Sequence, residues 1–204
     1  MKNKIVVGLI LAWGIMGCSH RTMPQMFTHQ EVLEKGPAEH WKGSSALMTL
    51  VATITPHLTK LGENKVSLRS NHFSGDNIYS VNGTVGDFKV YIQMDAQANG
   101  TYVTVFGRVE NIFLNFRLDG GDGFIMEGRG LVGEDSVEVV SVYRGSSIEL
   151  SGSIGDKTIA LQAYTSPSSG FSEVKGNVGE DTLRLNLNYE LGNYDLWGKV
   201  TNPF

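Results

Sequence analysis

From residue 59 to the end of the chain, apolar residues recur at every second position in short runs, and the runs themselves repeat. Apolar positions two residues apart are typical of a β-strand with one buried face. Seven copies at nearly one spacing indicate an internal repeat. The units begin 22 to 24 residues apart, at Thr59, Gly83, Gly107, Gly130, Gly152, Gly176 and Gly198.

A turn divides each unit into two arms. Tetrads such as GDFK, GEDS, GDKT and GEDT separate the first two apolar positions, and Gly and Asp are the residues that tight turns require. Each unit is therefore predicted to be a β-hairpin with a four-residue loop, in which Val85 faces Val90. In the same register Phe106 lies opposite Arg117, and the glycine that begins six of the seven units lies on the apolar face.

The links between hairpins are also short, which predicts an antiparallel meander. We expect an all-β fold: a meander of about seven β-hairpin repeats, with about 13 strands, curved or closed into a barrel-like sheet. A sheet with one wholly apolar face has to cover that face in water, and closure also removes the edge strands. A parallel β-helix with rungs of similar length is the alternative.

One stretch before the repeats has a different period. Apolar residues three or four positions apart in residues 44–61 predict one short N-terminal helix over about 45–55, ended by Pro56. The β-branched residues Val51 to Thr55 make a strand the competing prediction. The helix would either fill the apolar face of the sheet or cover its middle strands.

The first residues predict export. Lys2 and Lys4 precede an apolar run from Ile5 to Met16, which is too short for the roughly 20 residues that span a bilayer and is typical of a signal peptide. The run ends in Ile15-Met16-Gly17-Cys18, which resembles the lipobox of bacterial lipoproteins, and Cys18 is the chain's one cysteine.

This resemblance implies a processed and acylated protein. Residues 1–17 would be the signal peptide, and Cys18 would carry acyl chains such as palmitate. Residues 18–43 would be a flexible tether, and residues 44–204 the repeat domain. In enteric bacteria the serine after the cysteine, Ser19, favours the outer membrane of the cell envelope. Several acyl chains together give stable anchoring, so the membrane is the expected partner of Cys18.

Charge and composition exclude other classes of partner. The formal net charge is −4 and no basic run occurs, so we expect no nucleic-acid partner. Removing residues 1–17 takes away two lysines and no acidic residue, which makes the charge −6. With one cysteine, no disulfide forms within the chain.

No catalytic motif stands out. Four of the five histidines precede the repeats, and the fifth, His72, lies within the first unit. The acidic residues of the repeats cluster in the turns. We therefore expect no enzyme, metal or cofactor. The first hypothesis is a non-catalytic structural or interaction module of the envelope. The alternative is a carrier of a lipid or other apolar ligand, similar in outline to the half-barrels of bacterial lipoprotein carriers, and an outer-membrane β-barrel is a third.

The face of the sheet opposite the apolar one changes along the chain. In late strands it is polar, whereas in the middle strands apolar residues alternate with arginines. We take Phe106, Phe113, Arg117 and Arg129 as the candidate contact with an envelope protein or apolar ligand. The competing interpretation is that these side chains pack within the chain. The same two interpretations apply to the other apolar residues of this face, Ile125, Leu131, Val140 and Val142.

Overall fold

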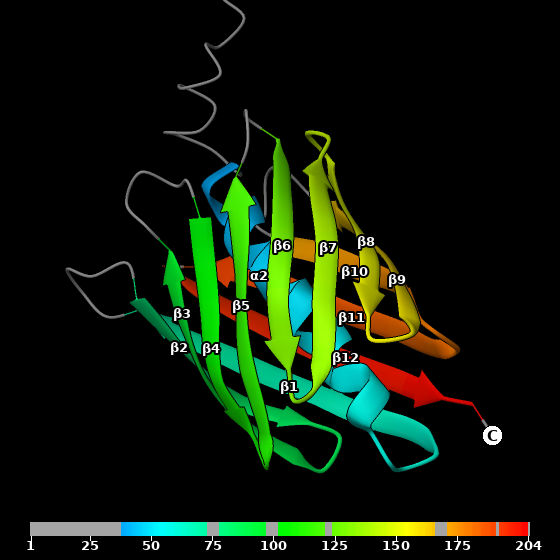
Figure 1. The fold of residues 1–204 in the computed structure, drawn as a ribbon. Helices are drawn as coiled ribbons and strands as arrows, with labels where there is room; N and C mark the ends of the chain where they lie inside the picture. The colour runs from blue at the N-terminus through cyan, green and yellow to red at the C-terminus, as the bar shows by residue number, and fades with distance from the viewer. Residues whose placement is uncertain are drawn as a thin grey trace, which may run out of the picture.

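The structure is a computed structural model, and it describes residues 38–72, 78–96, 102–120, 124–165, 171–190 and 192–203. Twelve antiparallel strands close into one barrel (Figure 1). The strands are β1 (Gly62–His72), β2 (Ile78–Val85), β3 (Phe88–Ala96), β4 (Tyr102–Val109), β5 (Ile112–Gly120), β6 (Ile125–Val132), β7 (Asp135–Tyr143), β8 (Ser147–Ile154), β9 (Lys157–Thr165), β10 (Phe171–Val178), β11 (Asp181–Glu190) and β12 (Asn193–Asn202).

The predicted meander is confirmed, in its closed form. Every strand pairs with its neighbours in the chain, and β1 pairs with β12 to complete the barrel. Twelve strands form rather than 13, because the first repeat unit supplies only β1. Its other arm continues from a short 3-10 helix, η1 (Thr55–His57), and is not a strand.

The predicted hairpin register is wrong by two residues. Val85 pairs with Phe88, not with Val90, and Phe106 lies opposite Asn115, not Arg117. The reason is the turn: Gly86 has a φ of 61°, the value that a two-residue turn with glycine at its first position requires. A shift of two leaves every side chain on its predicted face.

The recurring glycines lie on the inward face of the even-numbered strands. Gly83, Gly107, Gly152, Gly176 and Gly198 have φ between 146° and 150°, a conformation that side chains disfavour. A Cβ at Gly107 would lie 2.9 Å from the Cα of Ile92 on β3. These glycines therefore let neighbouring strands approach closely as the sheet coils.

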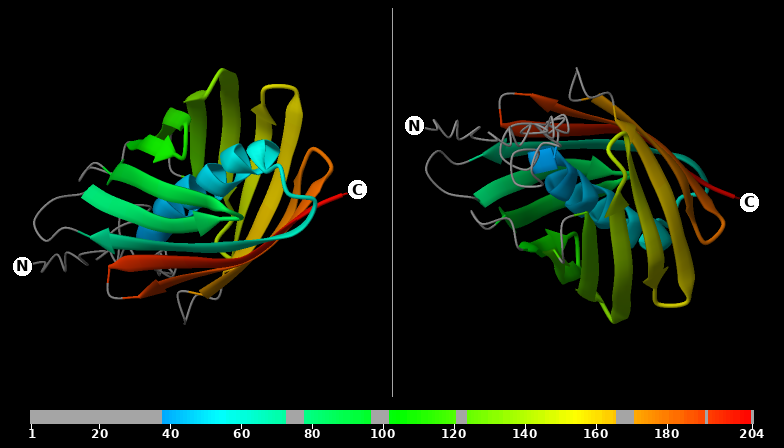
Figure 2. Two further views of the ribbon diagram at one scale, coloured as in Figure 1. Left: turned by 90° about the horizontal axis from the view of Figure 1, so that it is seen from below. Right: turned by 90° about the horizontal axis from the view of Figure 1, so that it is seen from above.

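The helix fills the barrel. Helix α2 (Ala38–Ile54) crosses the interior and contacts β4, β6, β7, β8 and β12 (Figure 2). Its side chains are buried on all sides from Ser44 to Ile54. The apolar face of the sheet points inward against it, which is the opposite of the arrangement that an outer-membrane barrel requires.

Helix α2 is longer than predicted, since it begins at Ala38 and includes residues assigned to the tether. Trp41 is 1% exposed and stacks on Tyr143 of β7, with ring centroids 5.7 Å apart. This tertiary contact extends the helix beyond the stretch in which periodicity is visible. Burial raises the pKa of the Tyr143 hydroxyl, which donates a hydrogen bond to the carbonyl oxygen of Gly145 at 2.6 Å.

Buried hydroxyl groups of α2 and η1 form hydrogen bonds inside the barrel, whereas the indole nitrogen of Trp41 has no hydrogen-bond partner among the described residues. The hydroxyl of Thr49 donates to the carbonyl of Ser45, and that of Thr55 to the carbonyl of Val51, both at 2.8 Å. The hydroxyls of Ser45 and Ser141 lie 2.7 Å apart, which ties the helix to β7. Bonding within the helix explains how a threonine-rich segment lies in an apolar core without a large desolvation penalty.

Candidate interaction surface

The outer wall of β3 to β7 carries large apolar side chains in contact with solvent. Tyr91 is 63% exposed, Phe113 55% and Leu131 53%. Phe106, Ile125 and Val140 are also exposed, and Val142 is half-buried. Among the described residues, α2 lies inside the barrel and does not cover this wall.

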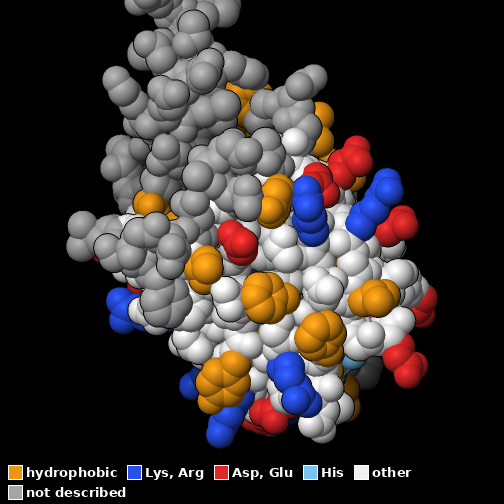
Figure 3. All heavy atoms as spheres, turned by 60° about the vertical axis from the view of Figure 1, so that its left-hand side comes forward, with side chains coloured by type: hydrophobic (Ala, Val, Ile, Leu, Met, Phe, Trp, Pro, Cys, Tyr) orange, Lys and Arg blue, Asp and Glu red, His pale blue; other side chains and the backbone are white. Residues whose placement is uncertain are grey.

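Strand register brings these side chains together from different hairpins. Arg108 on β4 lies opposite both Tyr91 on β3 and Phe113 on β5. In the next row Phe106 lies opposite Asn115, which in turn lies opposite Leu131. We call Tyr91, Phe106, Arg108, Phe113 and Leu131 the aromatic face. Figure 3 shows this side of the barrel, on which separate apolar side chains lie among basic and acidic ones.

Three arginines lie on or beside this surface, in different environments. Arg117 donates from Nε to Asp119 at 2.6 Å, and its guanidinium lies 3.8 Å from the ring centroid of Tyr102. Arg129 lies opposite Arg117 on one side and Glu138 on the other. Among the described residues, no carboxylate lies within ion-pair distance of Arg108.

Of the four predicted contact residues, the structure therefore places all on the outer surface of β4 to β6. Phe106 and Phe113 belong to the aromatic face, while Arg117 and Arg129 form a neighbouring row. Tyr91 was missed, although its position next to the inward Ile92 in the repeat predicts that it points outward. Arg108 has the same alternation and lies closer to the phenylalanines than Arg117 does.

A shallow groove of about 560 Å³ borders the aromatic face on β2 to β4. Tyr91 and Phe106 line it, and Gly107 lies at its base, where the strand coils. The remaining lining residues are Ile78, Ser80, Asn82, Ile92 and Gln93. The groove therefore offers rings and an aliphatic side chain together with a few hydrogen-bonding groups, which suits an apolar side chain of a partner.

A histidine and a carboxylate approach each other elsewhere, where η1 contacts the β6–β7 turn. His57 Nε2 and Asp135 Oδ2 lie 3.7 Å apart, beyond hydrogen-bond distance, and neither lines the groove at Gly107. Within the described ranges, no three His, Cys, Asp or Glu side chains are grouped to hold a metal ion. Nor is any helix there long and apolar enough to cross a bilayer.

The predicted lipid attachment residue, Cys18, lies outside the described residues, as does the predicted signal peptide. Comparisons with known proteins add no name: no protein-family model matches the chain, and neither the curated proteins nor the solved structures contain a significant match.

Proposed function

We propose that the chain is a lipid-anchored protein of the bacterial cell envelope, and that it is a non-catalytic module that binds an envelope protein through the aromatic face. The observation that carries the proposal is the exposure of Tyr91, Phe106, Phe113 and Leu131 on adjacent strands. Exposed apolar patches on a water-facing wall mark contact sites when they exceed a few hundred Å².

The composition of the aromatic face supports a protein partner. Tyrosine, phenylalanine and arginine are enriched at protein interfaces, where they provide most of the binding energy. Arg108 lies between two rings and has no carboxylate within ion-pair distance among the described residues. It is therefore available to a carboxylate of the partner.

The carrier alternative requires space inside the sheet. Helix α2 occupies that interior, and Leu47, Met48 and Leu50 on it are at most 2% exposed. The chain's own side chains thus take the place that an acyl chain would need, and this favours the interaction module over the carrier.

The partner site is tested by photo-crosslinking in the bacterium that encodes the protein. A benzophenone amino acid in place of Leu131 should give one discrete crosslinked product, and the same residue in place of Tyr164, exposed on β9, should not. Adding Arg108→Glu with Phe113→Ser should abolish the Leu131 product while unfolding changes by less than about 1 kcal/mol, as is usual for exposed sites. A product that persists in this variant contradicts the proposed contact.

The anchor is tested separately. Cys18→Ala should release the protein from membranes after a carbonate wash, because the thiol that takes the acyl chains is gone. Ser19→Ala is the matched control, since it changes the next residue and keeps the thiol. Retention of the Cys18→Ala protein in the membrane pellet contradicts lipid anchoring but leaves the aromatic face untouched.

A further inference from the structure

A second groove, of about 570 Å³, lies on another part of the barrel wall, on β1, β11 and β12. At its base is Gly198, in the same inward position as Gly107. The side chains around it are polar or charged: Glu63, Thr182, Arg184, Asn186, Lys199 and Thr201. This groove is separate from the aromatic face, so the partner proposed for that face does not account for it.

A row of cations crosses the groove. Lys175, Arg184, Lys199 and Lys65 lie directly opposite one another on four consecutive strands, β10, β11, β12 and β1. Like charges in directly opposed positions of a sheet repel and lower stability. Folding therefore does not account for this row.

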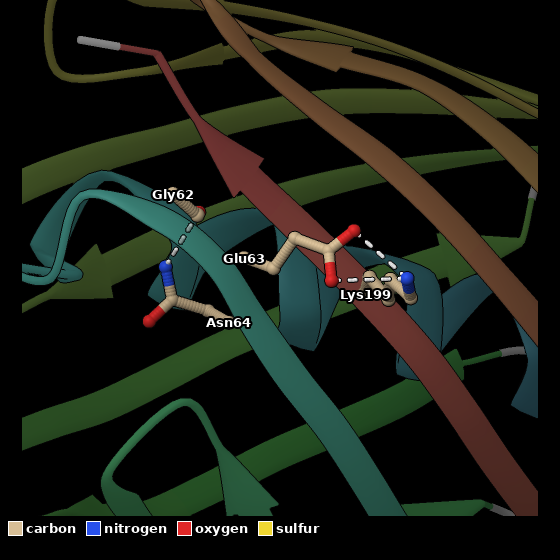
Figure 4. A network of polar contacts seen from close by, with 4 residues as sticks. All are labelled: Gly62, Glu63, Asn64 and Lys199. Atoms are coloured by element: carbon tan, nitrogen blue, oxygen red, sulfur yellow. Dashed lines mark hydrogen bonds and ion pairs between the residues drawn. The ribbon is translucent and has the colours of Figure 1, made fainter.

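Carboxylates compensate only part of this charge. Lys199 Nζ lies 2.8 and 3.0 Å from the two carboxylate oxygens of Glu63 (Figure 4), and Lys175 Nζ lies 2.8 Å from Glu173. Among the described residues, no carboxylate lies within ion-pair distance of Arg184 or Lys65. The guanidinium of Arg184 lies in the groove between two lysines that are already ion-paired, and it has no acceptor among the residues that the structure describes.

Neutral hydrogen-bonding groups and a ring surround Arg184. Thr182 and Thr201 lie opposite each other, and Asn186 lies opposite Trp197. Trp197 directly precedes Gly198 and is 41% exposed, and its ring lies 6.2 Å from that of Phe171, centroid to centroid. A flat apolar ring beside hydrogen-bond donors and acceptors complements a sugar, which has an apolar C–H face and a rim of hydroxyls.

We propose that the Gly198 groove binds a saccharide that carries a carboxylate. Arg184 pairs with the carboxylate, in the bidentate way that a guanidinium favours, and Trp197 stacks on the sugar ring. Thr182, Thr201 and Asn186 exchange hydrogen bonds with hydroxyls, and Glu63 accepts from them as well as from Lys199.

A nucleic acid fits this surface less well. Single-stranded nucleic acids need a groove of uninterrupted positive charge as well as stacking rings. Here Glu63 and Glu173 alternate with the lysines, and the whole chain has a net charge of −4. One uncompensated arginine inside the groove matches a ligand with one carboxylate per sugar better than a chain of phosphates.

The test measures binding of the full chain, purified in detergent micelles, to four polymers. The acidic saccharides are polygalacturonate and muramic-acid glycan strands freed of peptide, and the comparison polymers are dextran and polyphosphate. We expect binding to at least one acidic saccharide and little to either comparison polymer. Arg184→Gln should weaken it by at least about tenfold, because a hydrogen bond to a charged group is lost.

Matched variants separate the site from general electrostatics. Arg108→Gln removes the same charge from the aromatic face and should change affinity by less than about twofold. Trp197→Ser should weaken binding while Trp197→Phe preserves most of it, and Arg184→Lys should restore part of it. The unfolding midpoint of each variant shows that the barrel is intact.

Three results would overturn the proposal. The first is no binding to either acidic saccharide. The second is an equal loss in Arg108→Gln and Arg184→Gln, which would mean that total charge alone determines binding. The third is tighter binding of polyphosphate than of both saccharides with no effect of Trp197→Ser, which would make the groove a general polyanion site.

Discussion

The grooves at Gly107 and Gly198 lie at equivalent positions of two even-numbered strands, β4 and β12, and have nearly the same volumes, about 560 and about 570 Å³. Their backbones agree closely, with φ of 150° and 147° at the two glycines. Their side chains do not. Tyr91 and Phe106 line the first, whereas Arg184 and Lys199 line the second.

The difference separates two constraints on the repeat. Inward positions must accommodate the coiling of the sheet and pack on α2, so aliphatic residues recur there in every unit and glycine in all but the first. Outward positions meet only solvent and neighbouring strands, so each unit can carry its own chemistry. One architectural device thus produces a groove at several places on the wall, and the outer side chains determine what each groove recognises.

The largest expected effect is a loss of stability, and it tests whether the backbone at the two grooves has the same requirement for glycine. Gly107→Ala and Gly198→Ala should each destabilise the barrel by about 2–4 kcal/mol, from strain at positive φ and from overpacking. The added Cβ would lie 2.9 Å from the Cα of Ile92 in the first case and 2.7 Å from that of Leu185 in the second. Urea unfolding of both variants measures the effect.

Gly145→Asn is the control for this pair. Gly145 also has a positive φ, 75°, but a Cβ there meets no atom within 4 Å, and asparagine tolerates that conformation. Its cost should stay below about 1 kcal/mol. If the losses in unfolding free energy differ strongly between the two groove variants, or match that of the control, the two glycines do not have equivalent structural roles.

The residues that face the interior of the barrel can be predicted from the sequence. Period-two alternation places Val85, Val90 and the recurring glycines on one face, and the structure confirms that face. The register was wrong because GDFK permits a loop of four residues or of two, and the positive φ of Gly86 selects the shorter one. The end of α2 at Ile54, just before Pro56, was predicted, whereas its start depends on the contact of Trp41 with Tyr143.

The outward half is only partly readable. Alternation identifies Phe106 and Phe113 as outward, but whether a helix covers them depends on where α2 packs, which no local pattern reveals. The Gly198 groove was not predicted at all. Lys65 and Lys199 are far apart in the sequence, and they lie opposite each other only because β1 pairs with β12.

The second prediction compares the change in stability when an arginine on each of the two walls is replaced by alanine. Arg117→Ala should cost about 0.5–1 kcal/mol, because it removes the contacts with Tyr102 and Asp119. Arg184→Ala should be neutral or stabilise by up to about 0.5 kcal/mol, since it relieves repulsion between opposed cations. Urea unfolding at low and high salt checks both, and the gain from Arg184→Ala should shrink at about 1 M salt. A loss of stability in Arg184→Ala would show that this arginine has an internal role.

The smallest expected effect concerns Asp181, which begins β11 beside Thr182 of the Gly198 groove. Burial raises the pKa of its carboxyl, Lys157 lowers it and Glu180 raises it. Lys157→Met should therefore raise this pKa further, and Glu180→Gln should lower it, as measured by NMR titration of the side-chain carboxyl.

A carboxyl whose pKa is higher in the folded state contributes stability below its unfolded pKa and loses it as pH rises through the folded pKa. Asp181→Asn should thus gain stability relative to the parent between acidic and neutral pH, by less than about 0.5 kcal/mol because solvent screens this partly exposed site. A gain that instead grows toward acidic pH would mean that the ionised carboxylate is stabilised, and that the cations of this wall, rather than burial, dominate at the start of β11.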